Sequence, residues 1–273
     1  MDYSQLHLGK QTAYSDQYDP ALLVAVPRSA ARDFWPSDKT LPFVGEDCWT
    51  GYEVSWLNTQ GKPQVGCLLL DYSAQTPNIV ESKSLKLYLN SFNQTALKNH
   101  GELIEKIEKD VSAIVGGTVR VQCLSAGMDE ELSIRPWLDH CLDDAETSIT
   151  HYEITPALLS CDNGNKTEQT VISHLLRSNC PVTGQPDWAS VRIHYRGTNI
   201  CEKSLLQYLC SFRLHQGFHE QCIERIFCDL WTHCALELLS VEGRFTRRGG
   251  LDINPFRASH EHLKPTRARQ LRQ

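Results

Sequence analysis

SKSLKLYLNSF, residues 82–92, returns as EKSLLQYLCSF at residues 202–212, with seven identities at an offset of 120 positions. A second segment repeats close behind it, because IEKIEKD at 104–110 matches IERIFCD at 223–229, at an offset of 119. Self-similarity at one fixed distance marks a duplicated structural unit. The chain is therefore expected to hold two copies of one unit, each with two helices on the repeated segments.

Alternating segments accompany both copies. WTGYEVSW (49–56) precedes the first copy and WASVRIHY (188–195) the second, and both alternate as half-buried strands do. TVRVQCLS (118–125) and LELLSVEGRF (236–245) are expected to follow the helices as strands. The first copy is expected to carry one extra strand, QVGCLLLDYS (64–73). This order predicts an α+β chain of two packed β-β-α-α-β units.

The two copies are separated by MDEELSIRPWLDHCLDDAE (128–146), an acidic stretch that is expected to be a linker. We therefore expect an N-terminal module over residues 1–138 and a C-terminal module over 139–273.

The bulk composition narrows the class of protein. The 273 residues are 41% hydrophobic and 22% charged, as in ordinary globular proteins, and the net charge of −6 argues against nucleic acid as a direct partner. The longest apolar stretch, ALLVAV (21–26), is too short to span a bilayer. MDYSQLHLGK (1–10) lacks the pattern of a secretion signal, so a cytoplasmic location is expected.

The eleven cysteines are scattered with no CxxC, which favours free thiols in a reducing compartment. Cys222, Cys228 and Cys234 follow one another at intervals of six residues. On a helix each would be rotated by about 240° from the last, so they cannot share a face. The sequence therefore predicts no metal site.

LLRSNCPVTGQPDW (175–188) contains one cysteine, Cys180, followed by the turn formers Gly184 and Pro186 and by Asp187. Most free cysteines are small buried hydrophobic residues, and that interpretation stays open for Cys180. The functional alternative is a nucleophilic thiol with a nearby proton donor, for which Asp187 is the candidate. An aspartate that merely caps the turn is the plain alternative.

Phe218, His219 and Glu220 open the second helix expected in the second copy. A carboxylate there can accept two parallel N–H bonds from a guanine-like edge while an aromatic neighbour stacks on the ring. The plain alternative is a glutamate that favours the helix N-terminus, beside a histidine on the surface.

Two further segments suit phosphate. Glu81, Ser82 and Lys83 open the first helix of copy one, where a hydroxyl, N–H groups and a lysine could bind an anion, although helix capping explains them nearly as well. Arg247 and Arg248 precede two glycines, which allow a dinucleotide phosphate to approach the backbone, although a solvated basic loop is the default. No GxGxxG occurs, which argues against a Rossmann site.

The two copies differ at these segments. An ungapped alignment on Trp49 and Trp188 places Leu41 opposite Cys180, and copy one has no equivalent of Asp187. The fold therefore does not require this cysteine and aspartate. If the segments of both copies cooperate, we expect the site to lie where copies or subunits meet.

In combination these motifs resemble one family, the NADPH-dependent 7-cyano-7-deazaguanine reductases of queuosine biosynthesis. The resemblance is carried, in order, by ESKSLKLYLNSFNQT (81–95), CPVTGQPDW (180–188), FHEQC (218–222) and RRGGLDINP (247–255). VPRS (26–29) extends it towards the N-terminus. The duplicated build is similar to the two-module form of the family.

The resemblance implies two tandem tunnelling-fold (T-fold) modules of β-β-α-α-β-β order, whose sheets associate into barrels, and a homodimer. It also implies reduction of the nitrile of 7-cyano-7-deazaguanine to the primary amine of 7-aminomethyl-7-deazaguanine. Two NADPH would be consumed, and a covalent cysteine thioimide would form on the way.

Roles are implied at positions that match the family's motifs. Cys180 would be the nucleophile and Asp187 the proton donor. Substrate would be bound by residues of both copies, namely Ile79, Val80, Glu81, Phe218, His219 and Glu220. NADPH would be bound by Ser82, Lys83, Arg248 and Gly249.

Two other functions remain open on the residues alone. A zinc-dependent pterin-forming cyclohydrolase of the same fold would require bound metal, and its ligand spacing is not evident. A non-catalytic module that binds a purine-like base through Glu220 would bind ligand without oxidising NADPH.

Overall fold

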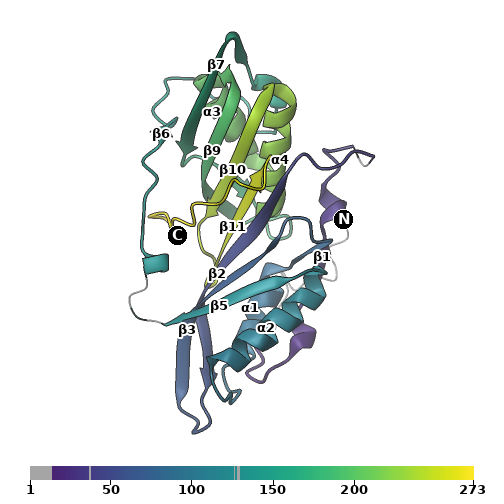
Figure 1. Ribbon diagram of the computed structural model, residues 1–273, viewed down its shortest axis with the longest axis vertical. Helices are drawn as coiled ribbons and strands as arrows, with labels where there is room; N and C mark the ends of the chain where they lie inside the picture. Colours follow the sequence, from purple (N-terminus) through teal and green to yellow (C-terminus); the bar gives the residue numbers. More distant parts are fainter. Residues whose placement is uncertain (1–13, 37, 126, 128–129) are drawn as a thin grey trace. The chain divides into compact units, whose positions relative to one another are not determined.

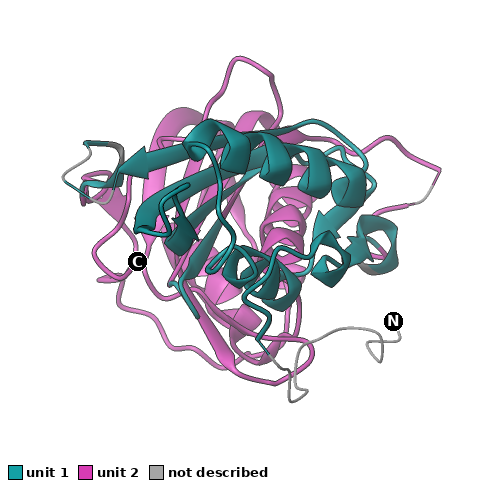
Figure 2. Cartoon of the chain, turned by 90° about the horizontal axis from the view of Figure 1, so that it is seen from below, with its two compact units in different colours: residues 1–32, 47–133, 247–253 teal, residues 33–46, 134–246, 254–273 magenta. Residues whose placement is uncertain are grey.

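The computed structural model describes residues 14–36, 38–125, 127 and 130–273, which form two compact units (Figure 2). Unit 1 comprises residues 1–32, 47–133 and 247–253, and unit 2 comprises 33–46, 134–246 and 254–273. Residues 1–10, on which the absence of a secretion signal was argued, lie outside the described residues. The boundary expected at residue 138 stays a prediction.

Unit 1 combines a sheet of strand order β5-β3-β2 with two helices (Figure 1). The strands are β2 (Val44–Leu57), β3 (Pro63–Ser73) and β5 (Val119–Ser125), and a separate pair joins β1 (Ala25–Pro27) to β4 (Asn78–Val80). The helices are α1 (Ser82–Asn90) and α2 (His100–Val115). Burial of Leu103, Ile107, Val111 and Val115, at helical spacing, gives α2 one apolar face that packs on β5.

Unit 2 repeats this plan with the strand order β11-β10-β9-β7-β6. Its strands are β6 (His140–Cys141), β7 (Cys161–Ser173), β8 (Arg177–Asn179), β9 (Pro186–Ile200), β10 (Leu236–Phe245) and β11 (Leu251–Ala258). Helices α3 (Glu202–Cys210) and α4 (His219–His233) lie on the repeated segments, and α4 packs on β10. The first residues of β2 belong to unit 2 and the first residues of β11 to unit 1.

The predicted duplication is confirmed down to single hydrogen bonds. The Tyr88 hydroxyl donates to Asp110 at 2.7 Å in unit 1, and the Tyr208 hydroxyl donates to Asp229 at 2.8 Å in unit 2. Each tyrosine also meets a phenylalanine edge to face, four residues further on, at centroid distances of 5.3 and 5.5 Å. The two helices pack on each other in the same way in both units, which explains why these residue types occur in both copies.

One expectation about the copies is wrong. The first copy has no extra strand, because two long strands precede the first helix in each unit: β2 and β3 in unit 1, β7 and β9 in unit 2. The alignment on the tryptophans paired β2 with β9, whereas chain order pairs β3 with β9. Cys180 consequently lies in the connection from β7 to β9, whose counterpart is the short turn between β2 and β3.

The acidic stretch at 128–146 is not only a linker. Its residues 140–141 form β6, which pairs in parallel with β7, and the Leu142 N–H donates to the Ile172 carbonyl at 2.9 Å. Trp137 and Leu142 are both buried. These apolar residues anchor the segment on unit 2. The many acidic residues around them led to the interpretation of the whole stretch as a linker.

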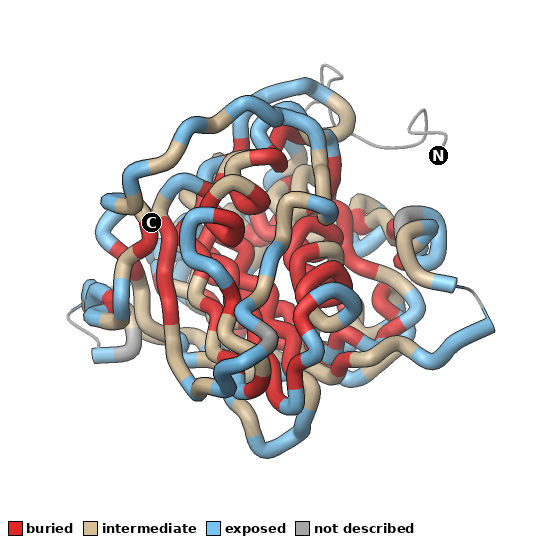
Figure 3. Tube along the Cα trace, turned by 90° about the horizontal axis from the view of Figure 1, so that it is seen from above, coloured by how far each residue is buried: buried red, intermediate tan, exposed pale blue. Residues whose placement is uncertain are grey.

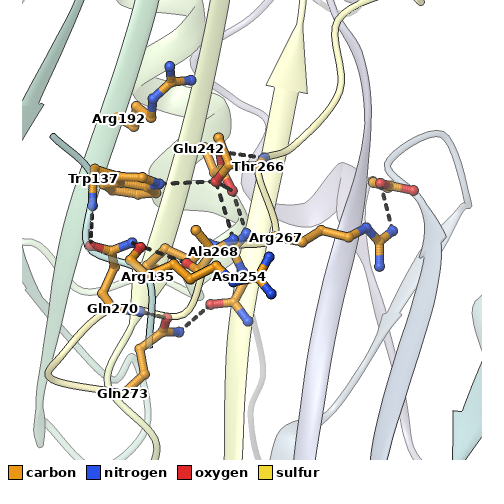
Figure 4. A network of polar contacts seen from close by, with 12 residues as sticks. Arg135, Trp137, Arg192, Glu242, Asn254, Thr266, Arg267, Ala268, Gln270 and Gln273 are labelled. Carbon is orange, nitrogen blue, oxygen red and sulfur yellow. Dashed lines mark hydrogen bonds and ion pairs between the residues drawn. The ribbon is translucent and has the colours of Figure 1, made fainter. Parts of the chain in front are cut away.

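The C-terminal segment is bound to unit 2 by a polar network (Figure 4). The Gln273 amide donates to the Phe245 carbonyl at 3.2 Å and to Asn254 Oδ1 at 2.6 Å. Trp137 Nε1 donates to Thr266 Oγ1 at 3.0 Å. Buried residues otherwise follow the strands and the inner faces of the helices (Figure 3).

The architecture is thus mixed α+β with two related units, as expected. In the part of the chain that the structure describes, β5 in unit 1 and β6 in unit 2 are edge strands, and the sheet order does not close into a barrel. Among the same residues, no helix is long and apolar enough to cross a membrane.

Candidate active site

Cys180 and Asp187 belong to one hairpin of unit 2. β8 pairs antiparallel with β9, so that Ser178 lies opposite Asp187. The turn between the strands is closed by two backbone bonds, from Cys180 N–H to the Gln185 carbonyl at 2.9 Å and from Gly184 N–H to the Cys180 carbonyl at 3.0 Å. Gly184 has φ +67°, a conformation that glycine adopts without steric cost. The Gly184–Pro186 turn therefore positions both predicted catalytic residues on one rigid loop.

The Cys180 side chain is 2% exposed, and its sulfur accepts the Thr183 N–H at 3.5 Å. The interpretation of Cys180 as a buried cysteine is therefore correct. Its sulfur is not surrounded by apolar groups alone, because the Thr183 N–H donates to it.

Asp187 is 6% exposed, and its Oδ2 lies 3.3 Å from His219 Nε2. The His219 ring in turn stacks on Phe245, with centroids 3.9 Å apart and planes 5° from parallel. The stacked ring fixes the direction from which the imidazole approaches the carboxylate. Asp187 is therefore held by the protein rather than placed as a simple turn cap.

Glu220 follows His219 in the first turn of α4 and is 2% exposed. Phe218, at the start of the same helix, is also buried, and its N–H donates to Gln221 Oε1 at 3.0 Å. The plain alternative for His219, a histidine on the surface, is wrong, because that side chain is only 11% exposed. The FHE segment thus presents an aromatic ring, an imidazole and a carboxylate from one helix start.

The charges of this cluster act on a second thiol. The pKa of Cys222 is raised to about 12, chiefly by burial and also by the nearby Asp187 and Glu220 carboxylates, while a hydrogen bond with Ser178 lowers it. Cys222 therefore stays a neutral thiol, unsuited to nucleophilic attack. Cys201 is the opposite case, because N–H groups of Ser204 and Lys203 at the start of α3 contribute to a lowered pKa of this exposed thiol.

The predicted substrate residues of the first copy lie in unit 1. Ile79 and Val80 are buried in β4, and Glu81 is fully buried as the N-cap of α1. The Glu81 carboxylate accepts the N–H groups of Lys83 and Ser84, both at 2.7 Å. Helix capping, the plain alternative for this segment, is therefore present, and it satisfies two N–H groups at the helix start.

The four predicted cofactor residues also lie in unit 1, and their chemistry suits NADPH phosphates. Gly249 has φ +59°, and a Cβ built there would lie 3.2 Å from Lys86 Nζ on α1. The turn that carries Arg248 and Gly249 therefore approaches the helix that begins with Ser82 and Lys83. Glu81 already binds two helix N–H groups, so positive charge at this place comes from the cationic side chains of Lys83, Lys86 and Arg248.

The structure thus brings Cys180, Asp187, Phe218, His219 and Glu220 together in unit 2, and the remaining predicted residues in unit 1. Sequence reasoning missed Phe245 and Thr183. Phe245 lies in the segment RFTRRGG, which was interpreted only through its arginines and glycines. Phe245 is the last residue of β10, and that position gave no indication that its ring would stack on His219.

Comparison with known proteins identifies the family to which the chain belongs. Residues 14–123 match a family model described as nitrile reductase, 7-cyano-7-deazaguanine-reductase N-term, and residues 186–264 match one described as QueF-like protein. The chain is 46% identical to the NADPH-dependent 7-cyano-7-deazaguanine reductase of Bordetella bronchiseptica, over 100% of both chains.

Proteins of the same name are similar to an equal degree in other bacteria. The one from Colwellia psychrerythraea is 48% identical, over 100% of this chain and 97% of its own. The one from Burkholderia orbicola is 49% identical, over 97% of this chain and 98% of its own. Together with the matched family models, these full-length similarities show that the chain belongs to the NADPH-dependent 7-cyano-7-deazaguanine reductase family.

Proposed function

We propose that this chain reduces the nitrile of 7-cyano-7-deazaguanine to the primary amine of 7-aminomethyl-7-deazaguanine, in queuosine biosynthesis. The observation that carries the proposal is the hairpin of unit 2, which presents a buried cysteine and an aspartate held by His219. Four electrons are needed to convert a nitrile to an amine. Two NADPH supply them as two hydrides, one before and one after the covalent bond to the protein is broken.

Cys180 attacks the nitrile carbon and forms a C–S bond, while Asp187 protonates the nitrile nitrogen. The product of this step is a thioimide. After the first reduction the C–S bond breaks, which frees the Cys180 sulfur and leaves an imine. Proton transfer from a positioned acid is typically worth about 10²–10⁴-fold in rate, so Asp187 is expected to matter even where attack is possible without it.

The low exposure of both groups supports protection of the imine, because a site without bulk water prevents its hydrolysis. Glu220 is proposed to accept the N–H groups of the deazaguanine edge, with Phe218 and His219 beside the ring. Ile79, Val80 and Glu81 are assigned to the substrate by family resemblance.

Ser82, Lys83, Arg248 and Gly249 are proposed to bind NADPH. The positive charge of Lys83 and Arg248 supports recognition of a phosphate, including the 2′-phosphate that distinguishes NADPH from NADH.

The two units are proposed to be T-fold modules, divided near residue 138, whose sheets close into barrels when two chains associate as a homodimer. The edge strands β5 and β6 support this, because an edge strand favours pairing with further strands. Function in the cytoplasm, without direct binding to nucleic acid, fits the need of Cys180 for a reduced thiol and the net charge of −6.

The test is an assay of the purified full chain with 7-cyano-7-deazaguanine and NADPH, followed by loss of NADPH absorbance. Substrate alone should add one substrate mass to the protein, and peptide mapping should place it on Cys180. Cys180→Ala should lose both the adduct and turnover, to the detection limit, because no other described group supplies the sulfur at that place.

Cys201→Ser is the matched control. Its thiol is exposed and has a lowered pKa, so general alkylating reagents should label it readily. It should nevertheless keep the adduct and normal turnover. An adduct that persists in Cys180→Ala and disappears in Cys201→Ser would refute the assignment of the nucleophile.

A further inference from the structure

A second group of chemically reactive side chains lies in unit 2, on the segment expected to be a linker. The Cys141 sulfur, an Asp143 carboxylate oxygen and a ring nitrogen of His174 all lie within 4.8 Å of one another. All three residues are half-buried. A thiol, an imidazole and a carboxylate are the donors that zinc prefers in proteins.

The sheet register explains why these three residues meet. β6 pairs with β7 in parallel, with Cys141 opposite Ile172. Continued by two residues, the same register places Asp143 level with His174. β6 ends at Cys141 and β7 ends at Ser173, so Asp143 and His174 directly follow the ends of two paired strands.

Neighbouring groups orient two of the three candidate ligands. Asp143 accepts the Ser173 hydroxyl at 2.6 Å and the His174 N–H at 2.9 Å. His174 Nδ1 lies 2.7 Å from the Oγ of buried Ser190. In the tautomer that donates Nδ1–H to Ser190, Nε2 keeps its lone pair, as in metal sites where a ligating histidine is held through its other nitrogen.

The charge of the cluster also suits a divalent cation. In the described part of the chain, no lysine or arginine forms an ion pair with Asp143. A thiolate together with the carboxylate would place two negative charges beside a neutral imidazole, and a divalent cation balances them. In a tetrahedral site with Zn–S of about 2.3 Å and Zn–N of about 2.1 Å, ligand atoms lie about 3.6 Å apart. The cluster would have to contract by about 1 Å at most.

We propose that Cys141, Asp143 and His174 form a zinc site that fastens β6 to β7. Three protein ligands leave the fourth position to water. The proposed site differs from the prediction of no metal site. That prediction rested on the absence of CxxC and on the spacing of Cys222, Cys228 and Cys234. Its consequence is structural: bound zinc holds the segment between the two copies on the sheet of unit 2.

The test uses the full chain, freed of metal by chelator, dialysed against zinc alone and analysed for metal content. One zinc per chain should remain bound, and zinc should protect Cys141 from alkylation when each cysteine is mapped by mass spectrometry. Cobalt in place of zinc should give a sulfur-to-metal charge-transfer band. Zinc should also raise the midpoint of thermal unfolding.

Cys141→Ser and His174→Ala should lose the zinc and the cobalt band, with Asp143→Asn as a milder variant that keeps the side-chain shape. Cys67→Ser, which removes a half-buried thiol of unit 1, and Cys180→Ala should both keep them. Wild-type protein that retains no zinc, or zinc retained equally by Cys141→Ser, would overturn the proposal. Alkylation of Cys141 at the same rate with and without zinc would do so independently of any variant.

Discussion

His215 illustrates how burial of a single side chain sets a pH response. It is half-buried after α3, and its backbone carbonyl accepts the Asn179 N–H at 2.8 Å, next to the Cys180 turn. Burial lowers the pKa of His215, the charge of Arg225 lowers it further, and Asp33 opposes them. The folded chain therefore favours the neutral ring.

Unfolding should become easier in mild acid for this reason. An unfolded histidine takes up a proton near pH 6.5, whereas folded His215 does so only at lower pH. Below about pH 6.5 the unfolded state therefore binds more protons, and the free energy of unfolding falls until the folded pKa is passed. Urea unfolding between pH 7.5 and 5 should show a smaller loss in His215→Gln than in wild type. His151→Gln, at an exposed histidine, should match wild type; an unchanged slope in His215→Gln would contradict this account.

At the scale of elements, the duplicated helix pairs offer a matched test. Tyr208 in α3 donates to Asp229 in α4, and Asp229 also accepts from Arg225 at 2.8 Å. Burial, together with Asp229, raises the pKa of Tyr208, so the hydroxyl remains a donor at all ordinary pH values. In unit 1, Asp110 accepts from Tyr88 and from Tyr18.

Tyr208→Phe and Tyr88→Phe should each destabilise the fold by about 1–2 kcal/mol, because a carboxylate, buried in Asp229 and half-buried in Asp110, loses one donor and keeps the other. The measurement is urea unfolding followed by circular dichroism. The two costs should agree within about 1 kcal/mol, given the equivalent geometry. A loss of stability in one variant and none in the other would show that the repeated tyrosines contribute differently to the stability of the two units.

At the scale of the whole molecule, the C-terminal segment connects distant parts of unit 2 to the candidate active site. Gln273 is 5% exposed, and its amide donates to the carbonyl of Phe245, whose ring stacks on His219. Its Oε1 accepts the Gln270 N–H at 3.0 Å. The last residue thereby supports the position of an aromatic ring far from it in sequence.

Gln273→Ala should destabilise unit 2 by about 1–3 kcal/mol, because it leaves buried polar groups without their partner. It should also lower kcat/KM for nitrile reduction, since Phe245 would no longer be fixed against His219. Leu271→Ala is the control, because that side chain is 77% exposed and should change neither quantity. Wild-type stability and kinetics in Gln273→Ala would mean that the segment does not support the site.

Several features could be predicted from the sequence because they depend on local pattern. The repeat of KSL, YL and SF predicted two related units, and the periodicity of IEKIEKD predicted α2. The order of elements in the repeat predicted β10 over its exact range, Leu236–Phe245. Cys180 and Asp187 were singled out because a thiol, a turn and an acid stood in one short stretch.

The sequence by itself thus determined the duplicated α+β plan and the identity of the reactive groups. Both can be recognised in short stretches of sequence, each made of residues near one another in the chain. Only the tertiary structure decided which strands correspond, that Phe245 stacks on the His219 that contacts Asp187, and that Cys141, Asp143 and His174 meet. The physical reason is sheet register. Pairing of β8 with β9 and of β6 with β7 joins side chains whose separation along the chain carries no periodic signal.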